Sequence, residues 1–298
     1  FRGNLANFLT LLKMIIKFAI LLLNIHPDNL LKKDTKYSYQ RFEFIRHGMK
    51  FKFGLLLLLC VGTCAYGQKN CLNFHVIDSA PLGYVDSNGD KRGVHIELLK
   101  NIEQLSGICI RLELMPYARI LHSLEEGQHD GGILFRYPQN SSFIDFVEHV
   151  QDMQTIIVAN RRFKLSSLAS LDGMIIGKTR GTDLSDSINL AGKFNVVELN
   201  NYGQAAALLA KSRIDAIAGS ALVLYYQLSH VYVGQEPIDF ANKLVLGTRA
   251  QWLQLSKKTP TSIDVVRLKR ATATTVADPS YKALMQQYYG VDWQKVNQ

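Results

Sequence analysis

The sequence has few cysteines and lacks the residue patterns that mark common catalytic and metal sites. Only four of its 298 residues are cysteine. It contains no Gly-x-Ser-x-Gly nucleophile elbow and no phosphate-binding glycine loop with its lysine, and its histidines do not fall into a metal-ligand spacing. It also has no internal repeat and no low-complexity tract. We therefore expect no enzyme activity, no metal and no cofactor.

A strong excess of basic charge is also missing from most of the chain. The formal net charge is +9, but ten of the 34 Lys and Arg residues and only three of the 25 Asp and Glu residues lie in residues 1–67. The remainder carries a net charge of only about +2, with no clustered basic face of the kind that nucleic-acid binding requires. We expect no nucleic-acid partner.

Residues 49–67 have the pattern of a cleaved secretory signal peptide. A short basic segment precedes the apolar residues 53–61, and the small residues Ala65 and Gly67 predict cleavage before Gln68. This apolar core is shorter than the roughly 20 residues of a membrane span. A short uncleaved anchor is the alternative, and we expect a periplasmic protein.

Residues 1–48 carry a second apolar stretch, which two lysines interrupt. This segment is either a leader or upstream sequence outside the mature protein, or an amphipathic or membrane helix. We leave it out of the prediction of the fold.

Two of the four cysteines, Cys71 and Cys109, follow the predicted cleavage site, and each lies at or within an apolar run. In an oxidising periplasm such a pair can form a disulfide. Two buried thiols are the alternative, because the sequence does not give the distance between the two residues.

Short apolar runs alternate with segments of helical periodicity after residue 71. This alternation is typical of parallel α/β sheets, and 231 residues are enough for two lobes. The predicted strands cover residues 72–77, 108–114, 131–135, 155–159, 174–177, 196–199, 214–218 and 244–248. The predicted helices cover residues 94–105, 117–126, 168–171, 203–211, 262–274 and 281–289, and a further helix begins at Thr182 or Asp183.

Several short segments resemble, in order and spacing, the extracytoplasmic solute-binding proteins of polar amino-acid transporters (family 3, type II periplasmic binding proteins). They are residues 80–84 with the Asn88-Gly89 turn, 93–99, 119–127 with 130–133, 177–182 and 208–216. The resemblance covers nearly all of residues 70–290. It implies two α/β lobes, each a mostly parallel sheet flanked by helices, joined by two hinge strands. Lobe 1 would comprise residues 68–157 and 241–298, and lobe 2 residues 158–240.

The chain departs from the family pattern where a zwitterionic amino acid would be held. Asn140 stands where an arginine usually binds the ligand's carboxylate, and Ser220 where an aspartate usually receives its ammonium group. Arg136, four residues earlier, is a possible substitute. A free α-amino acid is therefore a doubtful ligand.

The candidate ligand-binding residues lie at the expected rims of a cleft between the lobes. Arginines there would bind an anion, residues 179–182 would offer backbone N–H groups at a helix start, and tyrosines would wall the cleft. The alternatives are a surface arginine, an ordinary capped helix and tyrosines that pack a lobe. The candidates are Tyr84, Tyr117, Arg119, Arg136, Arg180, Thr182 and Ser220.

The sequence favours a periplasmic protein that captures a small polar or anionic solute by cleft closure and delivers it to an inner-membrane ABC transporter permease. We expect a monomer. A ligand-sensing module of the same fold, acting on a signalling receptor, is the alternative. An enzyme on this scaffold would need an acid and a base in the cleft, for which Glu97 and Asp130 are the candidates.

Overall fold

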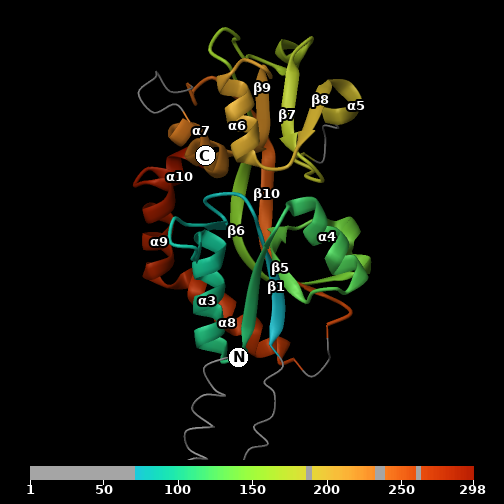
Figure 1. The fold of residues 1–298 in the computed structure, drawn as a ribbon, viewed down its shortest axis with the longest axis vertical. Helices are drawn as coiled ribbons and strands as arrows, with labels where there is room; N and C mark the ends of the chain where they lie inside the picture. The colour runs from blue at the N-terminus through green and yellow to red at the C-terminus, as the bar shows by residue number, and fades with distance from the viewer. Residues whose placement is uncertain (1–70, 186–189, 232–238, 260–262) are drawn as a thin grey trace, which may run out of the picture. The chain divides into compact units, whose positions relative to one another are not determined.

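The computed structural model describes residues 71–298, apart from 186–189, 232–238 and 260–262 (Figure 1). The predicted leader (1–48) and signal peptide (49–67) lie outside the described residues. Residues 69–298 form one compact unit. Among the described helices, none has the length and the apolar character needed to cross a membrane.

One eight-stranded sheet runs through this unit in the order β4-β1-β5-β10-β6-β9-β7-β8. Its two long central strands, β6 (Ile144–Ala159) and β10 (Lys243–Ser256), are antiparallel to each other. The sheet of lobe 1 adds β1 (Leu72–Ile77), β4 (Ile110–Met115) and β5 (Gly131–Phe135), and that of lobe 2 adds β7 (Ile175–Thr179), β8 (Asn195–Leu199) and β9 (Ala216–Ser220). Figure 1 shows β6 and β10 passing from one group of strands to the other.

Helices cover both faces of the lobe 1 sheet. In Figure 1, α3 (Val94–Ser106), α8 (Val265–Ala277) and α9 (Pro279–Tyr289) lie on one side and α4 (Tyr117–Glu126) on the other. Both α3 and α4 end at a glycine in the left-handed conformation, Gly107 and Gly127, which only glycine adopts without strain. Their predicted bounds agree closely with the structure.

Lobe 2 carries its own helical segments. They are the 3₁₀ turn η3 (Leu168–Leu171), α5 (Leu190–Lys193), α6 (Tyr202–Ala210) and α7 (Ala221–Val231). The remaining elements are a hairpin of β2 (Tyr84–Val85) and β3 (Lys91–Arg92), the 3₁₀ turn η2 (Pro138–Ser142) and α10 (Trp293–Val296).

Side chains that point to opposite faces of β9 belong to two different hydrophobic clusters. Ile217 belongs to the larger hydrophobic cluster, which also contains the buried residues of lobe 1, whereas Ala216 and Ala218 belong to a smaller cluster within lobe 2. Successive strand residues point to opposite faces of a sheet, so both faces of β9 are covered. The core thus continues from lobe 1 into lobe 2 through the central strands.

The structure also differs from the sequence-based expectations. The predicted helix start at Thr182 or Asp183 is wrong, because residues 182–185 are irregular and α5 begins at Leu190. The strands predicted at 155–159 and 244–248 are only parts of β6 and β10. Cys71 and Cys109 form a disulfide, which joins the starts of the neighbouring strands β1 and β4.

Candidate functional site

A small cavity of about 20 Å³ lies between the two lobes. Residues at or just after the carboxyl ends of the parallel strands β1, β5, β7, β8 and β9 supply most of its wall. In open α/β sheets this is the edge where small molecules bind. The lining residues are Ile77, Ser79, Leu82, Tyr117, Phe135, Thr179, Thr182, Asn200, Asn201, Tyr202, Ser220, Val223 and Gln251.

The lobe 2 wall depends on one close approach between a glycine and an aromatic ring. A Cβ atom on Gly219 would lie only 2.1 Å from the ring of Tyr202, so the ring can lie there only over a glycine. This position allows the Ser220 backbone N–H to donate to the Tyr202 hydroxyl at 3.2 Å. Asn201 caps α6 by accepting from the Gln204 N–H at 2.9 Å, which fixes the start of the helix that carries Tyr202.

Contacts between protein groups close the cleft around this cavity. The Tyr137 hydroxyl of lobe 1 donates to the Asp183 carbonyl of lobe 2 at 2.8 Å, and the Asp183 N–H donates back to that hydroxyl at 3.2 Å. Gln227 on α7 donates its amide N–H to the Ala80 carbonyl. Gly181, with φ of 77°, lies so close to Ala118 that a Cβ atom there would come within 3.2 Å of it. The structure therefore represents a closed arrangement of the lobes.

Among the described lining residues, no side chain carries a formal charge. The ionisable groups nearby pair with one another. Lys178 donates to Glu198 at 2.8 Å and to the Thr182 carbonyl at 2.9 Å, and Arg249 lies 3.5 Å from the Asp183 carboxylate. The lysine lowers the pKa of Glu198, so this pair is ionised at neutral pH.

Burial keeps the titratable groups at the cavity neutral. It raises the pKa of Tyr202 to about 12 and also raises the pKa values of Tyr117 and Tyr137, so all three hydroxyls keep their protons at neutral pH. Behind the cavity, burial lowers the pKa of His95 to about 4, so its imidazole is uncharged as well. The site thus presents hydroxyl, amide and aromatic groups.

Three hydroxyls of the cavity lining, those of Ser79, Tyr117 and Thr179, are buried and make no hydrogen bond among the described residues. The backbone N–H of Ser79, by contrast, donates to the Ile77 carbonyl at 2.9 Å. Unpaired buried hydroxyls are uncommon and usually have a functional or structural reason. The Ser79 hydroxyl can therefore form a hydrogen bond with a molecule in the cavity.

Of the seven predicted ligand-binding residues, the structure brings three to the cavity: Tyr117, Thr182 and Ser220. Arg119 is exposed on α4, and Arg180 is exposed with its guanidinium 3.8 Å from the Glu198 carboxylate. Neither arginine lines the cavity.

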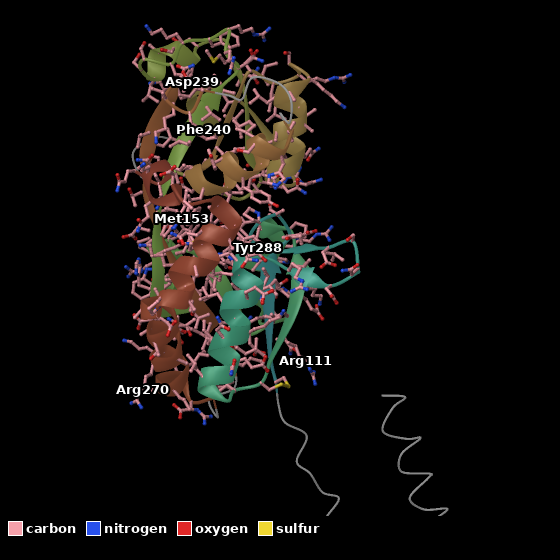
Figure 2. All side chains as sticks on the ribbon, turned by 90° about the vertical axis from the view of Figure 1, so that its left-hand side faces the viewer. Arg111, Met153, Asp239, Phe240, Arg270 and Tyr288 are labelled. Atoms are coloured by element: carbon pink, nitrogen blue, oxygen red, sulfur yellow. A yellow bond between two sulfur atoms is a disulfide. The ribbon has the colours of Figure 1, made fainter. Side chains whose placement is uncertain are left out.

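Arg136 and Tyr84 also lie elsewhere. The Arg136 guanidinium stacks on an aromatic pair, 4.9 Å from the ring centre of Phe146 and 5.1 Å from that of Trp252. Tyr84 lines a surface groove together with Tyr288, which is labelled in Figure 2.

Sequence reasoning missed several lining residues, including Ser79, Asn201, Tyr202 and Gln251. Two of them could have been predicted from the sequence. Asn201 and Tyr202 lie between a predicted strand and an alanine-rich predicted helix, where a loop at the cleft is expected. Gln251 lies on β10, whose predicted strand ended at residue 248, so it was not assigned to the cleft.

The family model of bacterial extracellular solute-binding proteins, family 3, matches residues 74–291. The chain therefore belongs to this family. No curated protein sequence matches it.

Solved structures with 16–17% sequence identity share the fold. A histidine kinase sensor domain with similarity to periplasmic binding proteins has a TM-score of 0.62 at 16% identity, and the match covers 75% of this chain and 97% of that one. The arginine-, lysine-, histidine-binding protein ArtJ from Geobacillus stearothermophilus has a TM-score of 0.62 at 16% identity, covering 77% and 100%. The GluR0 ligand-binding core from Nostoc punctiforme, solved with L-glutamate, has a TM-score of 0.60 at 17% identity, covering 74% and 99%. These matches establish a two-lobed periplasmic binding protein fold.

Proposed function

We propose that this chain is a periplasmic solute-binding protein that captures a small solute in the cleft between its lobes and delivers it to an inner-membrane ABC transporter permease. The observation that carries the proposal is the cavity, whose wall combines residues of lobe 1, such as Ser79 and Tyr117, with residues of lobe 2, such as Thr179 and Ser220. A solute that contacts both lobes binds the closed form more tightly and so shifts the equilibrium toward it. The protein releases the solute unchanged.

The disulfide between Cys71 and Cys109 supports the proposed compartment, because such bonds persist in oxidising environments like the periplasm. Tyr117, Thr182 and Ser220 remain our proposed ligand contacts, now together with Ser79, Tyr202 and Gln251. The lobe boundaries at residues 157/158 and 240/241 also remain a proposal. The first falls inside β6, which runs without a break from Ile144 to Ala159.

A ligand-sensing role is the second candidate. It is favoured by the similarity to the histidine kinase sensor domain, which has the same fold. The two roles share the cleft and differ in what recognises the closed form. Stimulation of a permease complex's ATPase by the solute-loaded protein would support transport, and activation of a fused kinase reporter by the solute would support sensing.

The test of solute capture is a ligand screen of the purified chain by thermal shift and small-angle scattering. The panel contains amino acids, organic acids, sugars, short peptides and small amides. A true ligand at a hundredfold its Kd should stabilise the folded form by about 2.7 kcal/mol. Because a cavity of about 20 Å³ has room for little more than one water molecule, the solute-bound form should be slightly less compact than the closed arrangement described above. A panel in which every compound leaves both measurements unchanged would contradict the proposal.

A further inference from the structure

We propose that the cleft selects an uncharged solute that carries hydroxyl or amide groups, and that it discriminates against carboxylates, ammonium ions and zwitterions. This inference rests on the proposed function and names the class of solute for the same site. It follows from the hydrogen bonds and ion pairs of Lys178, Arg249 and the backbone of residues 179–182.

The buried cationic side chains described near the cavity already pair with protein carboxylates. Lys178, at the end of β7, is buried and already donates to Glu198 and to the Thr182 carbonyl. Arg249 lies against the Asp183 carboxylate and the Tyr137 ring. A ligand carboxylate would have to compete with these protein carboxylates, which are already in place.

Backbone N–H groups at the lobe 2 turn are occupied as well. The Arg180 N–H donates to the Leu199 carbonyl at 2.9 Å, and the Thr182 N–H donates to the Thr179 carbonyl at 3.2 Å. The Gly181 N–H bonds to Glu198, which helps to lower the pKa of that carboxyl. The anion cradle that the sequence predicted at residues 179–182 therefore has its donors satisfied within the protein.

A solute ammonium group would likewise have to compete with cations of the protein. Among the described residues near the cavity, the carboxylates of Asp183 and Glu198 are held by Arg249 and Lys178. Ser220, which stands at the carboxyl end of β9, supplies only a hydroxyl, 3.6 Å from the Met153 sulfur. A buried ion without a partner is costly, whereas a neutral polar group needs only hydrogen bonds.

Neutral recognition groups are plentiful by contrast. The lining offers hydroxyls from Ser79 and Thr179 and amides from Asn200, Asn201 and Gln251. Aromatic rings complete the wall and suit a flat or ring-shaped face of the solute. The aromatic lining residues are Tyr117, Phe135 and Tyr202.

The first arm of the test uses pairs of compounds that differ in charge and little in shape, titrated into the full chain by calorimetry. The pairs are succinamide and succinate, 2-pyrrolidone and pyroglutamate, uracil and orotate, and 1,4-butanediol and 1,4-diaminobutane. In each pair that binds, we expect the neutral member to bind at least about tenfold more tightly. A charged member that binds as tightly as its neutral partner would overturn the inference and leave the proposed function standing.

The second arm needs no ligand and compares Ser220→Asp with Ser220→Asn. In a cleft without a free cation, burial raises the pKa of the new carboxyl in the folded state above its unfolded value of about 3.9. The aspartate variant should then melt several degrees below the asparagine variant at pH 7, and the gap should close as the pH falls below about 4. Equal melting temperatures at pH 7 would show an available cation and would overturn the inference.

The two arms of the test distinguish a failure of this inference from a failure of the proposed function. If no compound of the first arm or of the broader screen binds, the proposed function fails, and the second arm alone still decides whether the cleft is uncharged.

Discussion

His95 lies on α3 with none of its side chain exposed to solvent. Burial lowers its pKa to about 4. His129 has a similarly lowered pKa, about 4, because it is buried and because its charged form would be repelled by His75, whose ring centre lies 3.8 Å away. A histidine that is easier to protonate in the unfolded chain favours unfolding in acid.

The pH dependence of stability follows from this difference. The unfolded imidazole titrates near pH 6.5 and the folded His95 near pH 4, so its contribution is complete above pH 6.5 and is lost as the pH falls toward 4. Between pH 7 and pH 4, the free energy of unfolding of His95→Gln should therefore fall by about 3 kcal/mol less than that of the parent protein. Urea titrations of both proteins at the two pH values give the comparison. A variant whose loss equals that of the parent would rule out His95 as a source.

At the level of secondary structure, the long strand β6 has one edge that β9 covers only from Thr155 onward. Before that residue, Asn297 continues the pairing. Its side-chain oxygen accepts from the Gln154 N–H at 2.9 Å, and its amide donates to the Asp152 carbonyl at 2.7 Å. Figure 2 shows Met153, the residue between these two, about midway along the molecule. Asn297 thus protects the edge of a hinge strand as a neighbouring strand would.

Replacing Asn297 with alanine should therefore destabilise the fold by about 1–2 kcal/mol, because two backbone groups lose their partners. Chemical denaturation measures this change. The matched control is Gln294→Ala on the neighbouring helix α10, where the side chain is exposed and the expected effect is within about 0.5 kcal/mol. Equal effects of the two substitutions would mean that the edge contact contributes nothing to stability.

The sequence predicted most elements of lobe 1 and the strands of lobe 2, because buried parallel strands and amphipathic helices have distinct periodicities. It did not predict the full length of β6 and β10. Their outer halves mix polar and apolar residues, as Asp145 and Glu148 on either side of Phe146-Val147 illustrate, and lack the continuous apolar run that marks the predicted parts. The helix α7 was missed because its first residues, Ala221 to Tyr226, are apolar on all sides and lack the one-sided periodicity of an amphipathic helix.

The sequence predicted where the candidate site lies, but only some of the residues that line it. The strand ends pointed to Thr182 and Ser220, which line the cavity. Arg136 was favoured because it stands next to Tyr137, yet neighbouring residues at a strand end point in opposite directions. Tyr137 turns into the cleft, and Arg136 lies outside it over Phe146 and Trp252.

For the molecule as a whole, closure depends on contacts between lobes that the protein makes by itself. The hydroxyl of Tyr137 takes part in two hydrogen bonds with the backbone of Asp183. We expect Tyr137→Phe to weaken the closed form by about 1 kcal/mol, or roughly fivefold in the open-to-closed equilibrium. Small-angle scattering of the ligand-free protein should then report a larger radius of gyration.

The control for this prediction is Tyr281→Phe. That hydroxyl is buried on α9 in lobe 1, away from the cleft, and has no hydrogen-bond partner among the described residues. Its removal should leave the radius of gyration unchanged. If Tyr137→Phe has no larger effect than Tyr281→Phe, the contact with Asp183 does not hold the lobes together.

The order of strands in the sheet also governs how the polypeptide acquires its structure during synthesis. Strand β5 ends at Phe135, but its antiparallel neighbour β10 begins only at Lys243, after all of lobe 2 has been made. The sheet of lobe 1 therefore keeps an unpaired edge at β5 while more than a hundred further residues emerge. Such an edge readily joins other chains. A newly made chain would consequently benefit from protection by a chaperone until β10 has emerged.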